Sequence, residues 1–320
     1  MRIFSNRKLP TIITDILHQQ PELEIIEFTE ERSLSQEELI EYCKDVDGYL
    51  NFGHSHLNRH FMEQCPRLKV ISLFSVGYDH VDMEAAKGFG IAIGHTPDVL
   101  SKATSDTAFM LMMAVSRNAF HAHQHIQDGA WGFFRPFTDL GTDLHGKTLG
   151  VFGLGNIGQE MAKKCIGAFN MKVIYHNRSQ NKHAEDTLGA TYVSFEELLR
   201  QSDVLSLHAN LSEENTGKFD AAVFAQMKPT SIFINTARGA MHNEKDLTAA
   251  LEQGHIWGAG LDVTNPEPMQ ADNALLEMPN VCITPHIGSA TIETRNAMAQ
   301  LAANNLLATL KGAEMPAQVS

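Results

Sequence analysis

Several features that mark other protein classes are scarce in this sequence of 320 residues. It has only four cysteines, and no two of them form a CxxC pair: Cys43, Cys65, Cys165 and Cys282. This spacing argues against a disulfide framework and predicts reduced, mostly buried thiols in a cytoplasmic protein. No stretch approaches the ~18–20 consecutive apolar residues of a membrane span. Polar residues also interrupt any apolar signal core near the N-terminus.

Positive charge is scarce as well. The chain has 25 Lys and Arg against 38 Asp and Glu, a formal net charge of −13. Binding to nucleic acid or to an anionic membrane needs a basic face, so the balance predicts neither partner. A small anionic ligand is still compatible with it, because one local pocket can oppose the global field.

What the sequence does have is the pattern of an ordinary globular α/β protein. Hydrophobic residues make up 43% and charged residues 20%, and the length favours two domains. Short apolar runs alternate with helical patterns, which predicts βαβ units and parallel sheets. The expected strands are residues 2–5, 23–28, 48–52, 69–74, 91–94, 148–152, 172–176, 204–208, 231–235, 258–262 and 281–284.

Helix signals separate these strands. The longest pattern runs from Lys102 to Gln127, and its nearly all-apolar core at 108–115 predicts one helix buried between domains or subunits. Ser194 with Glu197 forms a capping box. Asn243 is expected to cap a helix that runs to Gly254, and a last helix is expected over residues 291–310.

A dinucleotide signature lies at residues 153–158, which read GLGNIG. Gly153, Gly155 and Gly158 match G-x-G-x-x-G, with a strand before them and a helix after them. Glycine permits the tight turn, the close approach to a pyrophosphate and the close packing of helix on strand, and the helix N-terminus faces the phosphates. The site is expected to include Asn156 and Ile157.

The end of the next strand predicts which dinucleotide binds. An NAD site has Asp or Glu about 20 residues further on, where it accepts a hydrogen bond from the ribose 2′-hydroxyl. This chain has Asn177 there, followed by Arg178 and Ser179. Because this position has no carboxylate, a 2′-phosphate would not be repelled there, and the guanidinium of Arg178 with the hydroxyl of Ser179 would bind it. The pattern favours NADP(H), with NAD(H) as a second possibility.

Reactive residues follow the later strands, at the edge where open α/β sheets bind ligands. His286 is of the residue type that most often exchanges a proton with a carbonyl oxygen or an alcohol in catalysis. Glu267, between two prolines, can fix the tautomer of that imidazole. Arg238 can polarise a ketone and bind a carboxylate. Asp262 suits the nicotinamide side of the site.

Together these segments resemble the D-isomer-specific 2-hydroxyacid dehydrogenase family, and within it the glyoxylate/hydroxypyruvate reductase branch. The matching motifs are SVGYDHVD (75–82), VLSKATSDTAF (99–109), GKTLGVFGLGNIGQ (146–159), NTARG (235–239), LDV…EP (261–268) and TPHIGSAT (284–291). The resemblance implies that Arg238, Glu267 and His286 carry catalysis. It also implies cofactor contacts from Asp262, Thr104, His208, Ala209, Thr236 and Ala237, and binding of the substrate carboxylate by the amides of Val76 and Gly77.

The family's fold would divide the chain into two doubly wound parallel-sheet domains. A Rossmann cofactor domain at 100–286 would be inserted in a flavodoxin-like substrate domain formed by 1–99 and 287–320. The expected activity is reduction of a small 2-oxo acid to the D-2-hydroxy acid with NADPH, in a homodimer. Other members of the family, of the D-lactate, 2-ketogluconate or phosphoglycerate type, stay open, as does a nucleotide-sensing corepressor.

Other residues bear on the pocket or depart from the family. Phe52, Phe74 and Trp131 are candidate pocket walls, with Phe52 assigned to the substrate. His121 and His125 share a helix face, but without acidic or cysteine partners they predict no metal site. Asn210 stands where many relatives have proline, and His242 with Asn243 replaces a common Val-Asp pair.

Overall fold

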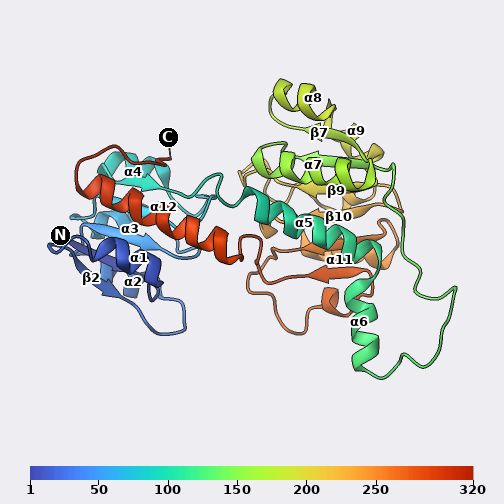
Figure 1. Ribbon diagram of the computed structural model, residues 1–320, viewed down its shortest axis with the longest axis horizontal. Coiled ribbons are helices and arrows are strands. Elements are labelled where there is room, and N and C mark those ends of the chain that lie inside the picture. The colour runs from blue at the N-terminus through green and yellow to red at the C-terminus, as the bar shows by residue number, and fades with distance from the viewer. Residues whose placement is uncertain (320) are drawn as a thin grey trace. The chain divides into compact units, whose positions relative to one another are not determined.

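The computed structural model describes residues 1–319 and divides the chain into two compact units. The first unit combines Met1–Leu100 with the C-terminal segment from Ser289, and the second is Ser101–Gly288. Each unit is built on its own parallel β-sheet (Figure 1), so the expected fold class is confirmed.

The first unit contains a five-stranded sheet in the order β2-β1-β3-β4-β5, which is the flavodoxin-like order. Its strands are β1 (Arg2–Ser5), β2 (Glu24–Glu27), β3 (Gly48–Asn51), β4 (Val70–Leu73) and β5 (Ala92–Gly94). Its helices are α1 (Thr11–Leu17), α2 (Gln36–Cys43), α3 (Arg59–Gln64), α4 (Met83–Phe89) and α12 (Ile292–Leu310).

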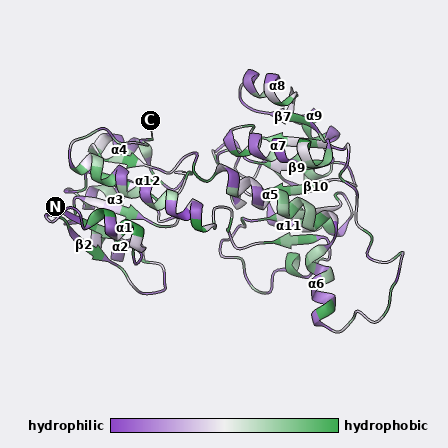
Figure 2. Cartoon of the chain, in the orientation of Figure 1, coloured by the Kyte–Doolittle hydropathy of each residue, from purple (hydrophilic) through white to green (hydrophobic). Residues whose placement is uncertain are grey.

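Side chains alternate between the two faces of this sheet, as the period of a strand requires. Ile3, Leu50 and Val70 pack with residues of α1 and α12 on one face. Phe4, Tyr49 and Ile71 pack with α2, α3 and α4 on the other. In Figure 2 the long helix α12 carries both hydrophilic and hydrophobic residues, as expected for a helix with one face on a sheet.

The second unit contains a seven-stranded sheet in the order β12-β11-β10-β9-β6-β7-β8. The strands are β6 (Thr148–Phe152), β7 (Lys172–His176), β8 (Thr191–Tyr192), β9 (Val204–Leu207), β10 (Ile232–Asn235), β11 (Gly258–Leu261) and β12 (Val281–Ile283). Numbered from β6, this is the doubly wound order of a Rossmann fold with one added strand. The order reverses between β6 and β9, where such folds bind dinucleotides.

Helices cover both faces of this second sheet. Buried residues of α5 (Ser101–Ser116), α7 (Asn156–Phe169) and α8 (Lys182–Leu188) form a core with one face. The other face packs against α9 (Phe195–Gln201), α10 (Ala221–Phe224) and α11 (Glu244–Glu252). The remaining elements are α6 (Ala119–Gln127) and two short 3-10 helices, η1 (Gly239–Met241) and η2 (Ala274–Glu277).

The single helix expected from Lys102 to Gln127 is wrong. The chain forms two helices there, α5 and α6, and Asn118 between them has a φ of 49°. Asparagine adopts this left-handed conformation more readily than most residues, and it ends the first helix. Apolar residues resume at Ala119 and Phe120, directly after this short polar break.

Two smaller outcomes complete the comparison. The two-residue strand β8 has too little apolar pattern to be expected, and the sheet gains a seventh strand through it.

The four cysteines are buried and unpaired, as predicted, and burial raises the pKa of Cys65 and of Cys165 to about 12. Within residues 1–319, no helix combines the length and apolar character needed to cross a membrane.

Candidate active site

The glycine loop lies between β6 and α7, at the carboxyl edge of the second sheet. Gly153 has a φ of 98°, and a Cβ there would lie 2.4 Å from the Ala209 backbone nitrogen. A Cβ on Gly158 would lie 2.5 Å from the Gly153 carbonyl oxygen, whereas one on Gly155 would meet no atom within 4 Å. Two glycines therefore allow close packing, and Gly155 leaves open space.

That open space lies at the N-terminus of α7. Gly155 caps the helix without a side-chain hydrogen bond, and Asn156 is exposed in its first turn. The backbone N–H groups of a helix N-terminus and the helix dipole attract anions. A pyrophosphate fits this position, because a Cβ built on Gly155 would meet no atom within 4 Å.

Residues 177–179 follow β7, but they differ in their contacts. The Asn177 side-chain oxygen accepts a hydrogen bond of 2.7 Å from the Leu154 backbone N–H, so Asn177 holds the glycine loop. Arg178 and Ser179 are exposed. The structure thus gives Asn177 a structural contact that the sequence did not indicate, and leaves the guanidinium and hydroxyl facing solvent.

Two polar atoms at the carboxyl ends of β9 and β10 have no hydrogen-bond partner among the described residues. Thr236 is 8% exposed and its Oγ1 makes no hydrogen bond, and the Nδ1 atom of His208 makes none either. His208 Nε2 contacts the Ser206 hydroxyl at 2.8 Å, and desolvation lowers the pKa of the ring to about 3. His208 is therefore neutral near pH 7. Buried orphan atoms of this kind fit a bound polar group.

The turn after β10 carries Arg238. Asn235 shapes this turn: its oxygen accepts from the Ala237 backbone N–H at 2.9 Å, and its nitrogen donates to the Arg238 carbonyl at 2.9 Å. The same nitrogen contacts His242 Nδ1 at 3.1 Å. The Arg238 guanidinium donates to the Ala237 carbonyl at 2.8 Å. Asn235 and His242 thus fix the backbone from which Arg238 extends.

Asp262 ends β11 and is almost fully buried, with 1% of its surface exposed. Its carboxylate accepts hydrogen bonds from Thr284 Oγ1 at 2.6 Å, from the Ile287 N–H at 2.8 Å and from the Gly288 N–H at 2.7 Å. Desolvation raises the pKa of this carboxyl despite these donors. Asp262 therefore holds the backbone after His286, a role the sequence did not indicate.

His286 follows β12 and forms a hydrogen-bonded pair with Glu267. The His286 Nδ1 atom lies 2.6 Å from Glu267 Oε1, and the two side chains are 34% and 37% exposed. The second Glu267 oxygen accepts from the Thr264 N–H at 3.4 Å. The contact is made by Nδ1, and a carboxylate partner on this nitrogen can hold the imidazole in one tautomer.

Arg238, Asp262 and His286 follow neighbouring strands at the same sheet edge. Strand β11 pairs with β10 on one side and β12 on the other, with Leu261 opposite Asn235 and Ile283. Neighbouring strands lie about 4.8 Å apart. Thr104 of α5 lies beside this edge, because a Cβ on Gly288 would be 3.3 Å from its Cγ2 atom. The fold thus brings an acid–base pair and a guanidinium to one edge.

The predicted substrate residues lie in the first unit, after β3 and β4. The loop of Val76 and Gly77 is held by Ser75 Oγ, which donates to the Gly77 carbonyl at 2.8 Å, and by His95 Nδ1, 3.0 Å from the Val76 carbonyl. The N–H groups of Val76 and Gly77 have no protein acceptor among residues 1–319. They suit a ligand carboxylate. The Phe52 ring packs against Phe74, with centroids 4.8 Å apart.

The histidine cluster of α6 gives no sign of a metal site. The rings of His121 and His125 lie 4.1 Å apart, but among the described residues no group of three or more His, Cys, Asp and Glu side chains could hold a metal ion.

Comparison with known proteins gives the family. Residues 109–288 match the family model of the NAD binding domain of D-isomer specific 2-hydroxyacid dehydrogenases. A glyoxylate reductase of Pyrococcus furiosus is 39% identical over 323 aligned positions, which cover 100% of this chain and 95% of that protein. The chain belongs to the D-isomer specific 2-hydroxyacid dehydrogenase family.

Solved structures agree with this membership. The TT0316 protein of Thermus thermophilus has a TM-score of 0.93 and 41% identity, with both chains covered completely. The NADPH-dependent glyoxylate/hydroxypyruvate reductase of Sinorhizobium meliloti, solved with NADP and malonate, has a TM-score of 0.84 and 32% identity over 100% of this chain and 96% of that one. This member of the dehydrogenase family is therefore an NAD(P)-dependent oxidoreductase.

The space at the N-terminus of α7 in this dehydrogenase fits an NAD(P) cofactor. Gly155 leaves space for the pyrophosphate, and the unpartnered atoms of His208 and Thr236 belong to residues that follow β9 and β10 in the same sheet. Sequence reasoning missed Asn235 as the residue that shapes the Arg238 turn. Its position at the end of a strand in NTARG was the available signal.

Proposed function

We propose that the chain is a glyoxylate/hydroxypyruvate reductase that uses NADPH and forms the D-2-hydroxy acid. The observation that carries this proposal is the 2.6 Å pair of His286 and Glu267 at the sheet edge that also carries the Arg238 turn. The full-length similarity to the Pyrococcus furiosus glyoxylate reductase supports the substrate class.

His286 is the proposed general acid. Its Nδ1–H is directed to Glu267, so the proton on Nε2 passes to the oxygen of the 2-oxo group as that oxygen becomes an alcohol. When bound, the reduced nicotinamide supplies the hydride that adds to C2. Glu267 stabilises the imidazolium before the transfer and keeps Nδ1 protonated after it. Asp262 holds the backbone at Ile287 and Gly288, which keeps the ring directed.

Arg238 is the proposed electrostatic group. Its guanidinium can bind the substrate carboxylate with its planar fork and oppose the negative charge that develops on the carbonyl oxygen. The N–H groups of Val76 and Gly77 are proposed to bind a carboxylate of the substrate, and Phe52 to contact the substrate. Support comes from the absence of a protein acceptor for those two N–H groups among residues 1–319.

The preference for NADPH is proposed from the end of β7. Arg178 and Ser179 are exposed there, and the chain has Asn177 where an NAD site has a carboxylate. Support comes from the Sinorhizobium meliloti relative, whose structure holds NADP. We further propose a cytoplasmic location, in keeping with four unpaired thiols.

A homodimer is proposed as the working form. The α5 residues Met110 and Met113 are 40% and 43% exposed, which is unusual for large apolar side chains. The segment after α6 exposes aromatic side chains at Trp131, Phe133, Phe134 and Phe137, of which the last is 88% exposed. Four exposed aromatic side chains within one short segment are typical of a surface that binds another protein.

The test is a substrate panel with a matched variant. Glyoxylate, hydroxypyruvate, pyruvate and 2-ketogluconate are each assayed with NADPH and with NADH. We expect the highest kcat/KM for glyoxylate or hydroxypyruvate with NADPH, and a fall in kcat of about 10²–10⁴-fold in His286→Asn. NADPH binding by that variant, followed by fluorescence, should persist. No oxidation of either cofactor with any of the four acids would refute the proposed function.

A further inference from the structure

The carboxyl ends of β1 and β3 hold two buried asparagines that the proposed chemistry does not use. These strands are neighbours in the first sheet, and the order of the strands reverses between them. Loops leave such a switch point in opposite directions and open a crevice, where this type of fold binds ligands. Asn6 follows β1 and Asn51 ends β3, and they are 4% and 1% exposed.

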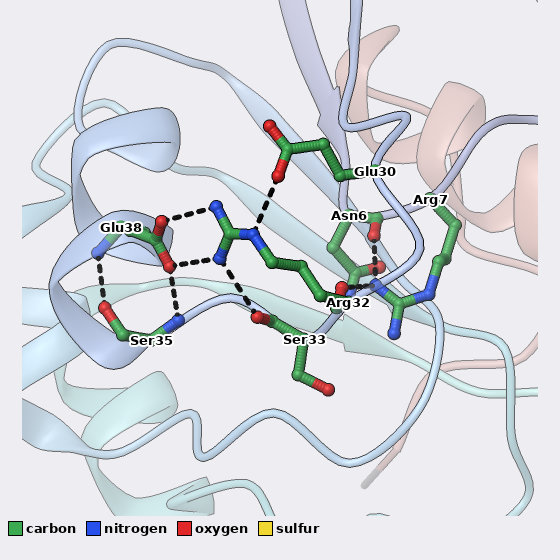
Figure 3. Close-up of polar contacts among 7 residues, drawn as sticks. All are labelled: Asn6, Arg7, Glu30, Arg32, Ser33, Ser35 and Glu38. Carbon is green, nitrogen blue, oxygen red and sulfur yellow. Dashed lines mark hydrogen bonds and ion pairs between the residues drawn. The ribbon is translucent and has the colours of Figure 1, made fainter.

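Asn6 holds the backbone of the residue that follows β3. Its side-chain oxygen accepts from the Phe52 N–H at 2.8 Å, and its side-chain nitrogen donates to the Phe52 carbonyl at 3.0 Å. Asn6 is itself anchored, because Arg7 Nη1 donates to the Asn6 carbonyl at 2.8 Å and to the Arg32 carbonyl at 3.0 Å (Figure 3). Phe52 lies beyond the end of β3, and the Asn6 side-chain amide thus supplies hydrogen bonds to its backbone that a neighbouring strand would supply inside a sheet.

Asn51 uses all of its hydrogen-bonding capacity in the same place. Its nitrogen donates to the Gly53 carbonyl at 3.1 Å and contacts His80 Nε2 at 3.2 Å. Its oxygen accepts from the Tyr49 hydroxyl at 2.8 Å and from the Asn6 nitrogen at 3.3 Å. Gly53 has a φ of 97°, so this backbone turns sharply where Asn51 holds it.

The hydrogen bonds of the two side-chain amides therefore connect two loops to each other. One loop begins at Phe52, and the other runs from Ser75 to His80 and includes Val76 and Gly77. Asn6 and Asn51 fix the backbone of the first loop, and Asn51 contacts the second through His80. The hydrogen bonds of the two buried amides favour a single arrangement of these loops, and losing one donor leaves other polar groups without partners.

We propose that Asn51, together with Asn6, is a positioning residue for the 2-oxo acid: the amide pair sets the Phe52–Gly53 loop against the Ser75–His80 loop. This inference rests on the proposed function, because it takes Phe52, Val76 and Gly77 as substrate contacts. The pair acts through those residues and touches no reactant. A misplacement of about 1 Å in such contacts can change the rate by about 10²-fold.

The main variant is Asn51→Asp. It keeps the shape and the acceptor for Tyr49, but it places a carboxylate oxygen against the Gly53 carbonyl and removes the donor. We expect the KM for glyoxylate and for hydroxypyruvate to rise 10-fold or more, and the ratio of the two KM values to change. The Kd for NADPH should stay within twofold, because the proposed cofactor residues are all in the other unit.

Two control variants separate positioning from stability. Ser72→Ala, in β4 of the same sheet, removes a buried hydroxyl that donates to the Ala302 carbonyl of α12 at 2.8 Å, so it lowers Tm without touching either loop. Its KM values should match those of the wild type. Tyr49→Phe removes one acceptor bond of Asn51 and keeps both donor bonds, and we expect a KM increase below threefold.

The outcomes decide between the claims. If Asn51→Asp lowers Tm as Ser72→Ala does but keeps both KM values within twofold, the network is only structural and the inference is overturned. If Asn51→Asp does not fold, Asn6→Asp serves in its place: it keeps the acceptor for the Phe52 N–H, loses the donor to the Phe52 carbonyl, and carries the same KM expectation. A wild-type chain that reduces neither acid would refute the proposed function itself, and the positioning role with it.

Discussion

At the residue scale, the buried histidine under the Arg238 turn links stability to pH. His242 is 2% exposed, and desolvation lowers its pKa from 6.5 to about 4. In the unfolded chain the ring gains a proton near pH 6.5, whereas in the folded chain it does so only near pH 4. Between these values the unfolded state binds more protons, so the free energy of unfolding falls as the pH falls.

We therefore expect His242 to cost about 3 kcal/mol of stability between pH 6.5 and pH 4, at about 1.36 kcal/mol per pH unit. Above pH 6.5 the ring is neutral in both states and contributes no pH dependence. Urea unfolding of the wild type and of His242→Asn at several pH values measures this, and the variant should lose part of the slope. His183→Gln, at an exposed position, is the control. Equal slopes in wild type and His242→Asn would contradict the assignment.

Arg178 gives a second prediction at this scale. If its guanidinium binds a 2′-phosphate, Arg178→Ala removes a charge-assisted hydrogen bond worth about 1.5–3 kcal/mol. The KM for NADPH should then rise about 10–100-fold, while the KM for NADH, which lacks the phosphate, should change less than twofold. Steady-state kinetics with both cofactors provides the measurement, and Arg200→Ala, in α9, is a matched control. Equal effects on both cofactors would remove the support for NADPH preference.

The chemical groups of the site could be predicted from residue type and motif, but their supports could not. His286 and Glu267 were expected to pair, and they lie 2.6 Å apart. Asn235, Asn6 and Asn51 had no visible role, because an asparagine at a strand end can bind its own turn, a neighbouring loop or water. Only the fold brings Asn6 to Phe52, which lies 46 positions further along the chain.

At the element scale, the junction of β6 and α7 separates two kinds of glycine. Gly155→Ala adds a methyl group where no atom lies within 4 Å, so Tm should stay within about 1 °C of the wild type while the Kd for NADPH rises 10-fold or more. Gly153→Ala forces a Cβ to 2.4 Å from the Ala209 nitrogen at a φ of 98°, and it should destabilise the fold by about 1–3 kcal/mol or more.

Calorimetry and fluorescence titration of the two variants provide the test. A Gly155→Ala variant that binds NADPH as the wild type does would show that this loop does not approach the pyrophosphate. A Gly153→Ala variant of unchanged Tm would contradict the packing described for the turn.

Helices and strands with a strong hydrophobic period were predictable, whereas features that depend on one or two residues were not. The capping boxes and the central strands follow from local chemistry, as at Ser194, which caps α9 together with Glu197. The break between α5 and α6 depends on the backbone of Asn118, and β8 has only two residues. Neither feature leaves a pattern long enough to detect.

At the scale of the whole molecule, alternating strands and helices were sufficient to predict parallel sheets in an α/β protein. The family resemblance then implied a Rossmann domain inserted in a flavodoxin-like domain, and the strand orders of both fold types are present. The association state depends on which apolar side chains are exposed, and the hydrophobic pattern of the sequence does not show that exposure.

We expect the wild type to have a mass about twice 35.4 kDa by light scattering after size-exclusion chromatography. The double variant Phe134→Ser, Phe137→Ser should shift the equilibrium toward the monomer, because those rings are 85% and 88% exposed and would be buried by a second subunit. Phe89→Ser, also exposed but in the first unit, is the control. A monomeric wild type at micromolar concentration would refute the homodimer.

The hydrogen bonds of Asp262 have a consequence for how mutagenesis of this enzyme is interpreted. Asp262→Asn would turn an N–H donor toward the Ile287 or Gly288 N–H, and two donors cannot share a bond. The backbone after His286 would then loosen, and turnover would fall although no group that exchanges a proton had been removed. A survey that scores positions by lost activity alone would count Asp262 among the proton-transfer groups, when its measurable contribution is to keep a neighbour in place.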